Sequence, residues 1–325
     1  MLTKLFLNSQ SKFIISNDIS VDKINHSYLI SCDDVDKLNE FSKYIACMLL
    51  CESKLGDKPC FNCGMCKKII CGTHADVSVY PKGKILTVEE SKLIANECFV
   101  VPIESDKKII IINNIDLART DSQNKLLKTL EEPPKNVVFI LTCSNIEGVL
   151  PTIRSRVKII YENLANSEDM LDDLSDQVNL KNIAELVQYS NGNLTRFNEF
   201  VANKSSLKVF DLCLDVLLNL KKSGDVLKFS YLILEEKDNL QLFFIVLTNF
   251  LGELLNVKMG KKTNFLNKEK ELEIIAKEYP INALVKIIEK CGEINQRMKF
   301  NCNPTIIVDN FLLYVLEVKY LCCRI

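Results

Sequence analysis

Short apolar runs rich in β-branched residues alternate with amphipathic stretches throughout the first half of this 325-residue chain. Several of these runs are apolar throughout, as parallel strands covered on both faces are. Thr87-x-x-Glu90 and Thr120-x-x-Gln123 are capping-box patterns, which predict the starts of two helices that lie between the apolar runs. The pattern predicts a doubly wound α/β domain with a parallel sheet. The predicted strands are His26 to Ser31, Asp76 to Tyr80, Lys107 to Asn113, Asn136 to Cys143 and Val157 to Tyr161.

Beyond about Asn163 the strand pattern gives way to helical periodicity, which is broken at sites such as Asn191-Gly192 and Pro280. A chain of this length exceeds one compact core, so we expect several domains. The predicted parts are an α/β domain over residues 1–162, a small all-helical domain over residues 163–205 and a larger all-helical domain over residues 206–325.

The stretch Val226 to Leu255 is unusually apolar and covers more than one helical face. We expect it to form part of an oligomerisation surface, because a free apolar surface of this size would aggregate. The core of an ordinary helical bundle is the alternative interpretation. The large side chains concerned are Phe229, Leu232, Leu234, Leu242, Phe243, Phe244, Val246 and Phe250.

The composition is that of an ordinary soluble protein, with 47% apolar residues, 26% charged residues and a formal net charge of -1. This charge predicts no strong attraction to nucleic acid or lipid. The N-terminus lacks the pattern of an export signal, and no uninterrupted run of about 18 apolar residues predicts a membrane span. We therefore expect a cytoplasmic protein without a membrane partner.

Four of the fourteen cysteines crowd into one short stretch with the spacing Cys51-x8-Cys60-x2-Cys63-x2-Cys66. In a reducing compartment such a cluster favours metal binding over disulfides. Tetrahedral Zn²⁺ prefers four soft ligands at this spacing, and a closed shell of four sulfurs leaves no position for a reacting water. The pattern predicts a structural zinc module over residues 51–72.

The sequence around the cysteine cluster also permits different ligands and different chemistry. Cys71 and His74 follow closely and could replace one of the four ligands. Fortuitous clustering in a cysteine-rich chain and redox chemistry between the thiols are further alternatives.

Several motifs, and the order in which they occur along the chain, resemble those of the bacterial clamp-loader family, which comprises the gamma/tau and delta-prime subunits of DNA polymerase III. The resemblance runs from His26 to about Tyr161 and is weaker in the helical remainder. It implies an AAA+-like α/β domain, a helical lid and a helical collar that assembles with gamma/tau and delta subunits. Such a loader opens the sliding clamp and places it on primed DNA. The motifs are HSYLIS from His26, the four-cysteine module, KTLEEPP from Lys128 to Pro134, the Ser155-Arg156 step, Gly192-Asn193-Leu194 and Asn301-Cys302-Asn303-Pro304.

The family's phosphate loop, G-x-x-x-x-G-K-T, is degenerate in this chain. A phosphate loop needs glycines and a lysine to surround the phosphates, but this segment has no glycine, and Leu38 stands where the lysine belongs. Asp33, Asp34 and Asp36 would repel a triphosphate. We expect no ATP binding and a surface position for Lys37. The segment reads Cys32, Asp33, Asp34, Val35, Asp36, Lys37, Leu38 and Asn39.

The acidic pair that holds Mg²⁺ in active family members is also missing. After the third predicted strand the chain has Asn113 and Asn114. Amides are poor ligands for hard cations and cannot act as bases at neutral pH. Asp116 lies two residues further on, where we expect it to have left the strand end. The sequence therefore predicts a chain without ATPase activity of its own.

The resemblance implies one direct part in catalysis, for Ser155 and Arg156. In clamp loaders the arginine of this step reaches into the ATP site of the adjacent subunit, where a guanidinium can bridge phosphate oxygens. The match departs from the family at Val157, where cysteine is frequent. Arg154 is the local competitor, and an ordinary surface salt bridge is the alternative for either arginine.

Two rival functions remain. One is an active ATPase of the gamma/tau type, against which the degenerate phosphate loop argues. The other is a zinc-containing nucleic-acid-binding protein, which would need basic and aromatic residues around the cysteines. Lys54, Lys58, Lys67 and Lys68 surround Phe61 there, but a solvated rim explains these lysines equally well.

Overall fold

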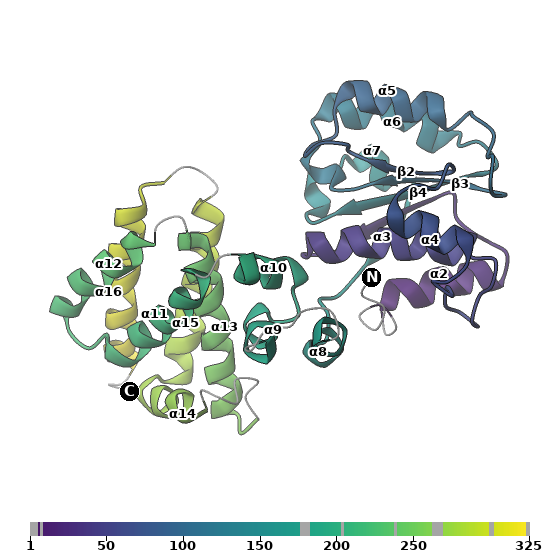
Figure 1. Cartoon of the computed structure of the whole chain (residues 1–325). Coiled ribbons are helices and arrows are strands. Elements are labelled where there is room, and N and C mark those ends of the chain that lie inside the picture. Colours follow the sequence, from purple (N-terminus) through teal and green to yellow (C-terminus); the bar gives the residue numbers. More distant parts are fainter. Residues whose placement is uncertain are drawn as a thin grey trace. The chain divides into compact units, whose positions relative to one another are not determined.

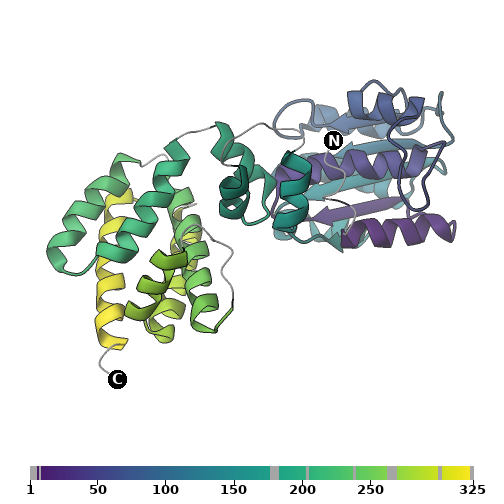
Figure 2. The same cartoon turned by 60° about the horizontal axis from the view of Figure 1, so that its bottom comes forward.

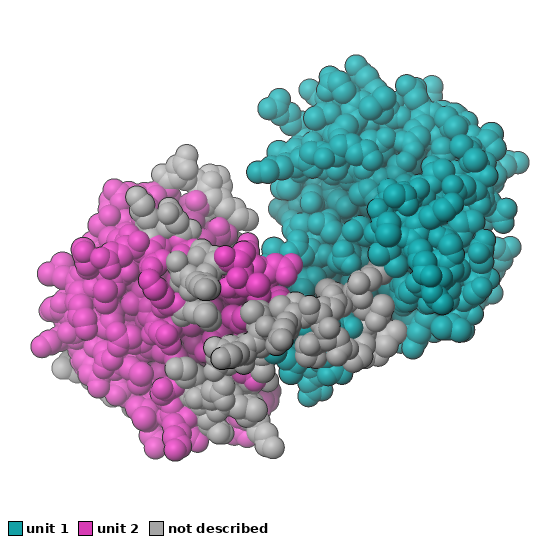
Figure 3. Space-filling model, viewed as in Figure 1, with its two compact units in different colours: residues 1–183, 192–195 teal, residues 184–191, 196–325 magenta. Residues whose placement is uncertain are grey.

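The computed structural model describes Phe6 and residues 9–175, 183–202, 205–236, 239–261, 269–298 and 302–322. The chain divides into two compact units, shown in Figure 3. The α/β unit comprises residues 1–183 and 192–195, and the helical unit comprises residues 184–191 and 196–325. The predicted division into three domains, with boundaries at residues 162 and 205, stays a prediction.

The α/β unit contains a parallel sheet of five strands in the order β2-β3-β4-β1-β5. β3 and β4 are buried along their whole length, and Ile110 of β3 lies opposite Phe139 of β4. This burial explains why their sequences are apolar throughout. All five strands fall where the sequence predicts them. They are β1 (Ser27–Ser31), β2 (Val77–Tyr80), β3 (Lys108–Ile112), β4 (Val137–Cys143) and β5 (Lys158–Tyr161).

Helices cover both faces of this sheet, with α5 and α6 on one face and α2 and α3 on the other (Figure 1). Ile94 of α5 and Leu126 and Leu130 of α6 are buried in one core cluster with residues of β3 and β4. The doubly wound architecture is thus confirmed. The helices are α2 (Gln10–Ser20), α3 (Val35–Leu50), α4 (Gly64–Cys71), α5 (Val88–Glu97), α6 (Thr120–Glu131), α7 (Pro151–Arg154) and α8 (Ser167–Ser175), with single 3-10 turns η1 (Ile115–Leu117) and η2 (Ile146–Gly148).

One of the two predicted capping boxes is present. Thr87 and Glu90 make both bonds of the motif at the start of α5. At α6 the prediction is wrong, because Thr120 is already the first helical residue. The buried Gln123 side chain instead donates to the carbonyls of Ala118 and Gly148 at 3.0 and 2.9 Å and accepts from the Leu150 N–H group at 2.9 Å. It thereby ties α6 to the turn that leads into α7.

The helical unit, seen from two sides in Figures 1 and 2, contains no strand among its described residues. Its long central helix, α13, packs against α11, α14 and α15. The helices are α9 (Ile183–Ser190), α10 (Leu194–Ala202), α11 (Ser205–Asn219), α12 (Ser223–Glu235), α13 (Leu240–Lys258), α14 (Glu269–Glu278), α15 (Ile281–Arg297) and α16 (Pro304–Cys322). The first two residues of α10 belong to the α/β unit.

Most large apolar side chains of the stretch from Val226 to Leu255 lie in the core of the helical unit. Phe229, Phe243, Phe244, Val246 and Phe250 are buried, and Leu232, Leu234 and Leu242 are partly buried. The alternative interpretation of the sequence, a bundle core, therefore accounts for these side chains without a partner. That residues 206–325 form an oligomerisation collar stays a prediction.

By length and composition, α13 is the one helix in the described part of the chain that could cross a membrane. Half of its apolar window is buried inside the unit. Core helices of soluble proteins show the same character, and the packing of α13 against α11, α14 and α15 explains its apolarity.

Candidate functional site

The topology of the sheet identifies the edge at which a ligand would bind. β1 lies between β4 and β5, so the chain crosses to one side of β1 after that strand and to the other side after β4. In doubly wound sheets, ligands bind at the carboxyl ends of the strands beside such a switch point. Cys32 to Asp34, Asn113 to Asn114 and Ser144 follow β1, β3 and β4 at this edge. The degenerate nucleotide motifs predicted from the sequence therefore lie at the same end of the sheet.

The Asp34 carboxylate lies at the N-terminus of α3, the first helix after β1. Asp34 is buried and caps α3, where its Oδ1 atom accepts the Lys37 backbone N–H group at 3.1 Å. The same carboxylate accepts the Leu194 N–H at 2.6 Å and the Thr195 N–H and hydroxyl at 3.1 and 2.9 Å. Helix N-termini bind anions through these N–H groups. Burial raises the pKa of Asp34, although these donors oppose the shift.

The segment Gly192 to Thr195 is held against this site by further bonds within the α/β unit. The Asn193 side chain donates to the carbonyl of Asp33 at 2.6 Å, and the Asp36 N–H donates to the Thr195 hydroxyl at 2.9 Å. Gly192 has φ of +74°, and a Cβ there would lie 2.0 Å from the Ala165 carbonyl oxygen. Only glycine fits this close approach.

Lys37 is buried, so its predicted surface position is wrong. Its Nζ atom lies 2.8 Å from Glu162 Oε1, just beyond β5, and donates to the Asn163 carbonyl at 2.5 Å. Glu162 also accepts from the Ser9 hydroxyl at 2.7 Å and the Ser11 N–H at 3.0 Å. Burial acts to raise the pKa of Glu162, but the Lys37 charge and these bonds lower it overall. The lysine is thus committed to an internal ion pair.

The two asparagines that follow β3 are bound to β4. The Thr142 hydroxyl donates to the Asn113 side-chain oxygen at 3.3 Å and accepts the Asn114 N–H at 3.1 Å. Asn114 has a left-handed backbone with φ of 52°. These contacts give the two amides a structural role at the end of the strand.

Asp116 lies in η1, beyond the end of β3, as its position in the sequence predicts. Its Oδ2 atom accepts from the Ser144 hydroxyl at 2.9 Å and from the Asn145 N–H at 3.0 Å. This carboxylate therefore joins the turn after β3 to the turn after β4.

Arg156 lies just after α7, and its side chain is 33% exposed. Its Nη1 atom donates to the Thr152 carbonyl at 2.6 Å and to the Ser155 hydroxyl at 3.1 Å. Its Nη2 atom pairs with the carboxylate of Glu131, the last residue of α6. The competitor Arg154 has a different partner, Glu147, at 3.1 Å.

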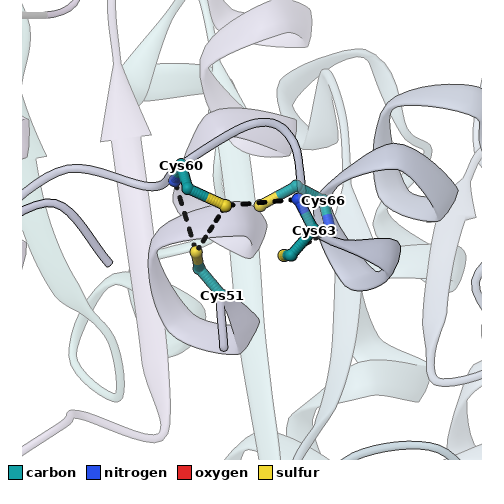
Figure 4. A group of neighbouring side chains, drawn as sticks. All are labelled: Cys51, Cys60, Cys63 and Cys66. Carbon is teal, nitrogen blue, oxygen red and sulfur yellow. Dashed lines mark hydrogen bonds between the residues drawn. The ribbon is translucent and has the colours of Figure 1, made fainter. Parts of the chain in front are cut away.

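The structure brings the four predicted cysteine ligands together. The sulfurs of Cys51, Cys60, Cys63 and Cys66 all lie within 4.8 Å of one another (Figure 4). Sulfurs around a tetrahedral zinc ion are about 3.8 Å apart when each bond is about 2.3 Å, and those of Cys51 and Cys60 are 3.5 Å apart. These four residues could bind a metal ion.

The backbone of the module stabilises thiolates. The N–H groups of Asn62 and Cys63 lower the pKa of Cys60 to about 6. The N–H of Cys66, 3.5 Å from the Cys63 sulfur, helps lower the pKa of Cys63 against the effect of burial. Burial raises the pKa values of Cys51 and Cys66. The lowered pKa of Cys60 favours the thiolate, the form in which cysteine binds a metal.

The alternative ligands are outside this group. Cys71 is exposed and is absent from the cluster. His74 is buried, where its Nδ1 atom accepts the Asp76 N–H at 3.1 Å and its Nε2 atom lies 3.2 Å from the Met65 sulfur. The four residues predicted from their spacing are thus the metal-binding candidates in the part of the chain that the structure describes.

Two of the aromatic and basic residues near the cysteines have structural partners. Phe61 packs against Tyr44 of α3 with ring centroids 5.6 Å apart. Lys68 pairs with Glu104 at 2.8 Å. The side chains of Lys54, Lys58 and Lys67 are exposed, so the nucleic-acid-binding alternative is not decided by these contacts.

Comparison with known proteins shows what this chain is similar to. Residues 8–164 match the profile of the family described as DNA polymerase III, delta subunit. The chain is 32% identical over 190 residues to DNA polymerase III subunit gamma of Buchnera aphidicola subsp. Schizaphis graminum, covering 55% of this chain and 52% of that protein. It is 28% identical over 211 residues to DNA polymerase III subunit delta' of Bacillus subtilis, covering 61% of this chain and 63% of that protein. Residues 8–164 thus match this family, and the chain is similar to the gamma and delta' subunits of DNA polymerase III.

The sheet order and the helices on both faces fit the AAA+-like domain that the resemblance implies for this family. The chain spans 52% and 63% of the lengths of these two relatives. A solved structure of a DNA polymerase III, gamma subunit-related protein from Thermotoga maritima covers 95% of this chain and 99% of its own, with 18% identity and a TM-score of 0.43. A likeness this low has no bearing on function.

Sequence reasoning missed Glu162, Thr195 and Glu131, the partners of Lys37, Asp34 and Arg156. Glu162 and Thr195 lie far from their partners in sequence, and no local sequence pattern predicts these contacts. Glu131 stands inside the KTLEEPP motif, which was a usable signal.

We predict that protein purified without chelator carries about one zinc ion per chain, as a single four-thiolate site holds. Cys63→Ser should lower the zinc content and speed hydrogen exchange in residues 51–72 more than in the helical unit, because a metal clip stabilises chiefly its own loop. Elemental analysis and exchange mass spectrometry measure both. Cys71→Ser is the control and should keep its zinc. A folded wild-type protein free of metal would refute the site.

We predict that Lys37→Met destabilises the α/β unit by about 3–5 kcal/mol, because it leaves the Glu162 carboxylate buried without its partner. In the wild type the pKa of Glu162 lies below its ordinary value of 4.5. The stabilisation that the pair gives is therefore fully present above pH 4.5, and it is lost as the pH falls through the lowered pKa. In the variant the pKa of Glu162 should rise. The difference in unfolding free energy between the wild type and Lys37→Met should therefore become smaller as the pH falls from about 7 to about 5, because the unpaired Glu162 carboxylate is then protonated.

Urea unfolding of both proteins across this range measures the difference. Lys43→Met, which removes the partly exposed pair with Glu40, is the control and should change stability by no more than about 0.5 kcal/mol. A pH-independent loss for Lys37→Met would contradict the role of Glu162 in this pair.

Proposed function

We propose that this chain is a delta-prime-type subunit of a DNA polymerase III clamp loader that binds no ATP itself. It supplies Arg156 to the ATP site of a neighbouring gamma/tau-type subunit, in a cytoplasmic complex that also contains a delta subunit. Through that complex it helps place the sliding clamp on primed DNA. The observation that carries the proposal is the Asp34 carboxylate at the N-terminus of α3.

Asp34 supports the absence of ATP binding in two ways. It accepts N–H groups that would otherwise face a phosphate, since its carboxylate bonds the starts of both α3 and α10. It also adds negative charge where phosphate charge would arrive. Two like charges about 4 Å apart near a protein surface repel by about 4 kcal/mol. A triphosphate would have to displace this carboxylate and break its bonds to Leu194 and Thr195.

The remaining groups at this edge support the same conclusion. Lys37, the one lysine in the degenerate loop, is buried in its pair with Glu162. Asn113 and Asn114 replace the acidic pair, and Asp116 is bound to the turn after β4. The two amides are poor ligands for Mg²⁺, and Asp116 Oδ2 is engaged by Ser144 and Asn145 rather than free to polarise a water.

Arg156 is suited to act on a neighbouring subunit because its guanidinium is partly exposed and permanently charged. Phosphoryl transfer is accelerated largely by positioned positive charge, which an arginine from an adjacent subunit can add as the γ-phosphoryl group leaves. The Ser155 hydroxyl accepts one N–H of this guanidinium and so helps to orient it. In this proposal Ser155 positions the arginine, and Arg156 touches the phosphate.

The cysteine module serves as a structural zinc site in the connection between β1 and β2. Cys51 directly follows α3, and Cys63 caps α4, so a bound ion would join these two helices. A closed set of four thiolates stabilises the loop without offering a reaction site.

Residues 206–325 form the collar through which the chain assembles with the other loader subunits in this proposal. Because the large side chains of α13 are internal, the assembly surface must come from exposed positions. Exposed apolar residues of this region include Leu227, Tyr231 and Leu313.

An active ATPase of the gamma/tau type is the second candidate, because a relative at 32% identity is a gamma subunit. That function would require the Asp34 carboxylate to leave the start of α3. Direct measurement of ATP binding separates the two candidates.

We predict that the isolated chain binds no ATP. Calorimetric titration with Mg-ATP should give only the heat of dilution, because the anion position is already filled by Asp34. The gamma/tau subunit of the same organism, titrated in parallel, is the positive control. Micromolar binding by this chain would restore the gamma/tau candidate.

We predict that Arg156→Ala lowers the DNA- and clamp-stimulated ATPase of the reconstituted loader without changing folding, zinc content or assembly. A trans-acting arginine contributes about three to five orders of magnitude at its own site, and the other ATP sites will dilute the observed loss. Steady-state turnover of the complex measures it.

Arg154→Ala is the matched control, because Arg154 lies two residues away and pairs with Glu147 rather than with Glu131. Its turnover should stay near that of the wild type. Equal, wild-type turnover in both variants would exclude Arg156 from catalysis.

A further inference from the structure

We infer that Glu131, in the KTLEEPP motif, is the residue that positions Arg156 for the neighbouring ATP site. The inference rests on the proposed function of Arg156. Glu131 is the last residue of α6, and its carboxylate pairs with Arg156 Nη2. The proposal assigns a role to an exposed carboxylate of this motif.

The guanidinium of Arg156 is held from two sides. A guanidinium has five N–H groups. Both on Nη1 are taken by the Thr152 carbonyl and the Ser155 hydroxyl, and Nη2 is held in an ion pair with the Glu131 carboxylate. The Nε N–H group, which none of these three partners uses, is left for a phosphate. The arginine is thus oriented before any nucleotide arrives, which is the condition under which a charge stabilises a transition state without reorganising.

Both ends of this pair are mounted on fixed elements. Leu126 and Leu130 bury α6 in the core, and Pro133-Pro134 prevents the helix from continuing past Glu131. Gln123 bonds α6 to the turn before α7, through the Gly148 carbonyl and the Leu150 N–H group. The two helices therefore keep the carboxylate and the arginine at a constant separation.

The exposure of the pair argues for orientation rather than stability. The side chains of Arg156 and Glu131 are 33% and 45% exposed, and pairs of this kind add little to the stability of a fold. An unpaired arginine at the surface would sample many rotamers, which lowers the fraction poised for a phosphate. Arg154 offers the contrast, because its partner Glu147 is 74% exposed and gives no comparable set of anchors.

The test uses the reconstituted loader and a double-mutant cycle. Glu131→Ala should lower the kcat of the DNA- and clamp-stimulated ATPase about tenfold and leave the KM for ATP unchanged, because a mispositioned catalytic group costs turnover. Made in the Arg156→Ala background, the same change should have no further effect. Glu131→Gln keeps an accepting oxygen at the same length and should fall between Glu131→Ala and the wild type.

Glu132→Ala is the matched control, since Glu132 is the adjacent exposed carboxylate of the same motif. It should leave turnover unchanged. Native mass spectrometry and thermal unfolding check that each variant assembles and folds, and Glu131→Gln decides the matter if Glu131→Ala does not assemble.

The outcomes separate the inference from the function on which it rests. If Arg156→Ala is silent, the proposed function of Arg156 fails. If Arg156→Ala lowers turnover while Glu131→Ala and Glu131→Gln do not, only the role of Glu131 is overturned. A loss from Glu131→Ala that persists in the Arg156→Ala background would likewise overturn it, because the effect would then not pass through the arginine.

Discussion

The hydrogen bonds of one buried carboxylate, that of Asp34, determine how this α/β unit is organised around its sheet. Asp34 satisfies N–H groups at the starts of α3 and α10, where an anion is otherwise favoured. The segment Gly192 to Thr195 is therefore bound to the loop after β1 without any ligand. In the proposed function this carboxylate takes the place that a phosphate would take in a nucleotide-binding subunit.

The second buried charge is compensated in the same way. Glu162 accepts from Lys37, Ser9 and Ser11, and so joins the start of α3, the end of β5 and the start of α2. Burying a charge is tolerated only with partners, and losing one partner is expensive. The interior of the unit is thus closed, whereas Arg156 remains at the surface and accessible. This contrast suits a subunit that acts on a neighbour rather than on a ligand of its own.

Much of this could be predicted from the sequence because the signals are local. Apolar runs of strand length predicted all five strands, since burial on both faces demands continuous apolarity. The spacing of Cys51, Cys60, Cys63 and Cys66 predicted a four-sulfur cluster, because ligands close in sequence can meet within one short loop. The absence of glycines between Cys32 and Asn39 also predicts a loop unable to surround a phosphate, and this stays a prediction.

Only the tertiary structure decided what lies opposite each of these residues. Lys37 looked like a surface residue, but its partner Glu162 stands 125 positions away, and no periodicity reveals such a pair. Apolarity of Val226 to Leu255 showed that the stretch must be covered, whereas the packing of α13 against α11, α14 and α15 decided that its own unit covers it. A sequence by itself determines which groups require partners; the folded chain determines which partners they obtain, because long-range contacts depend on how the elements pack.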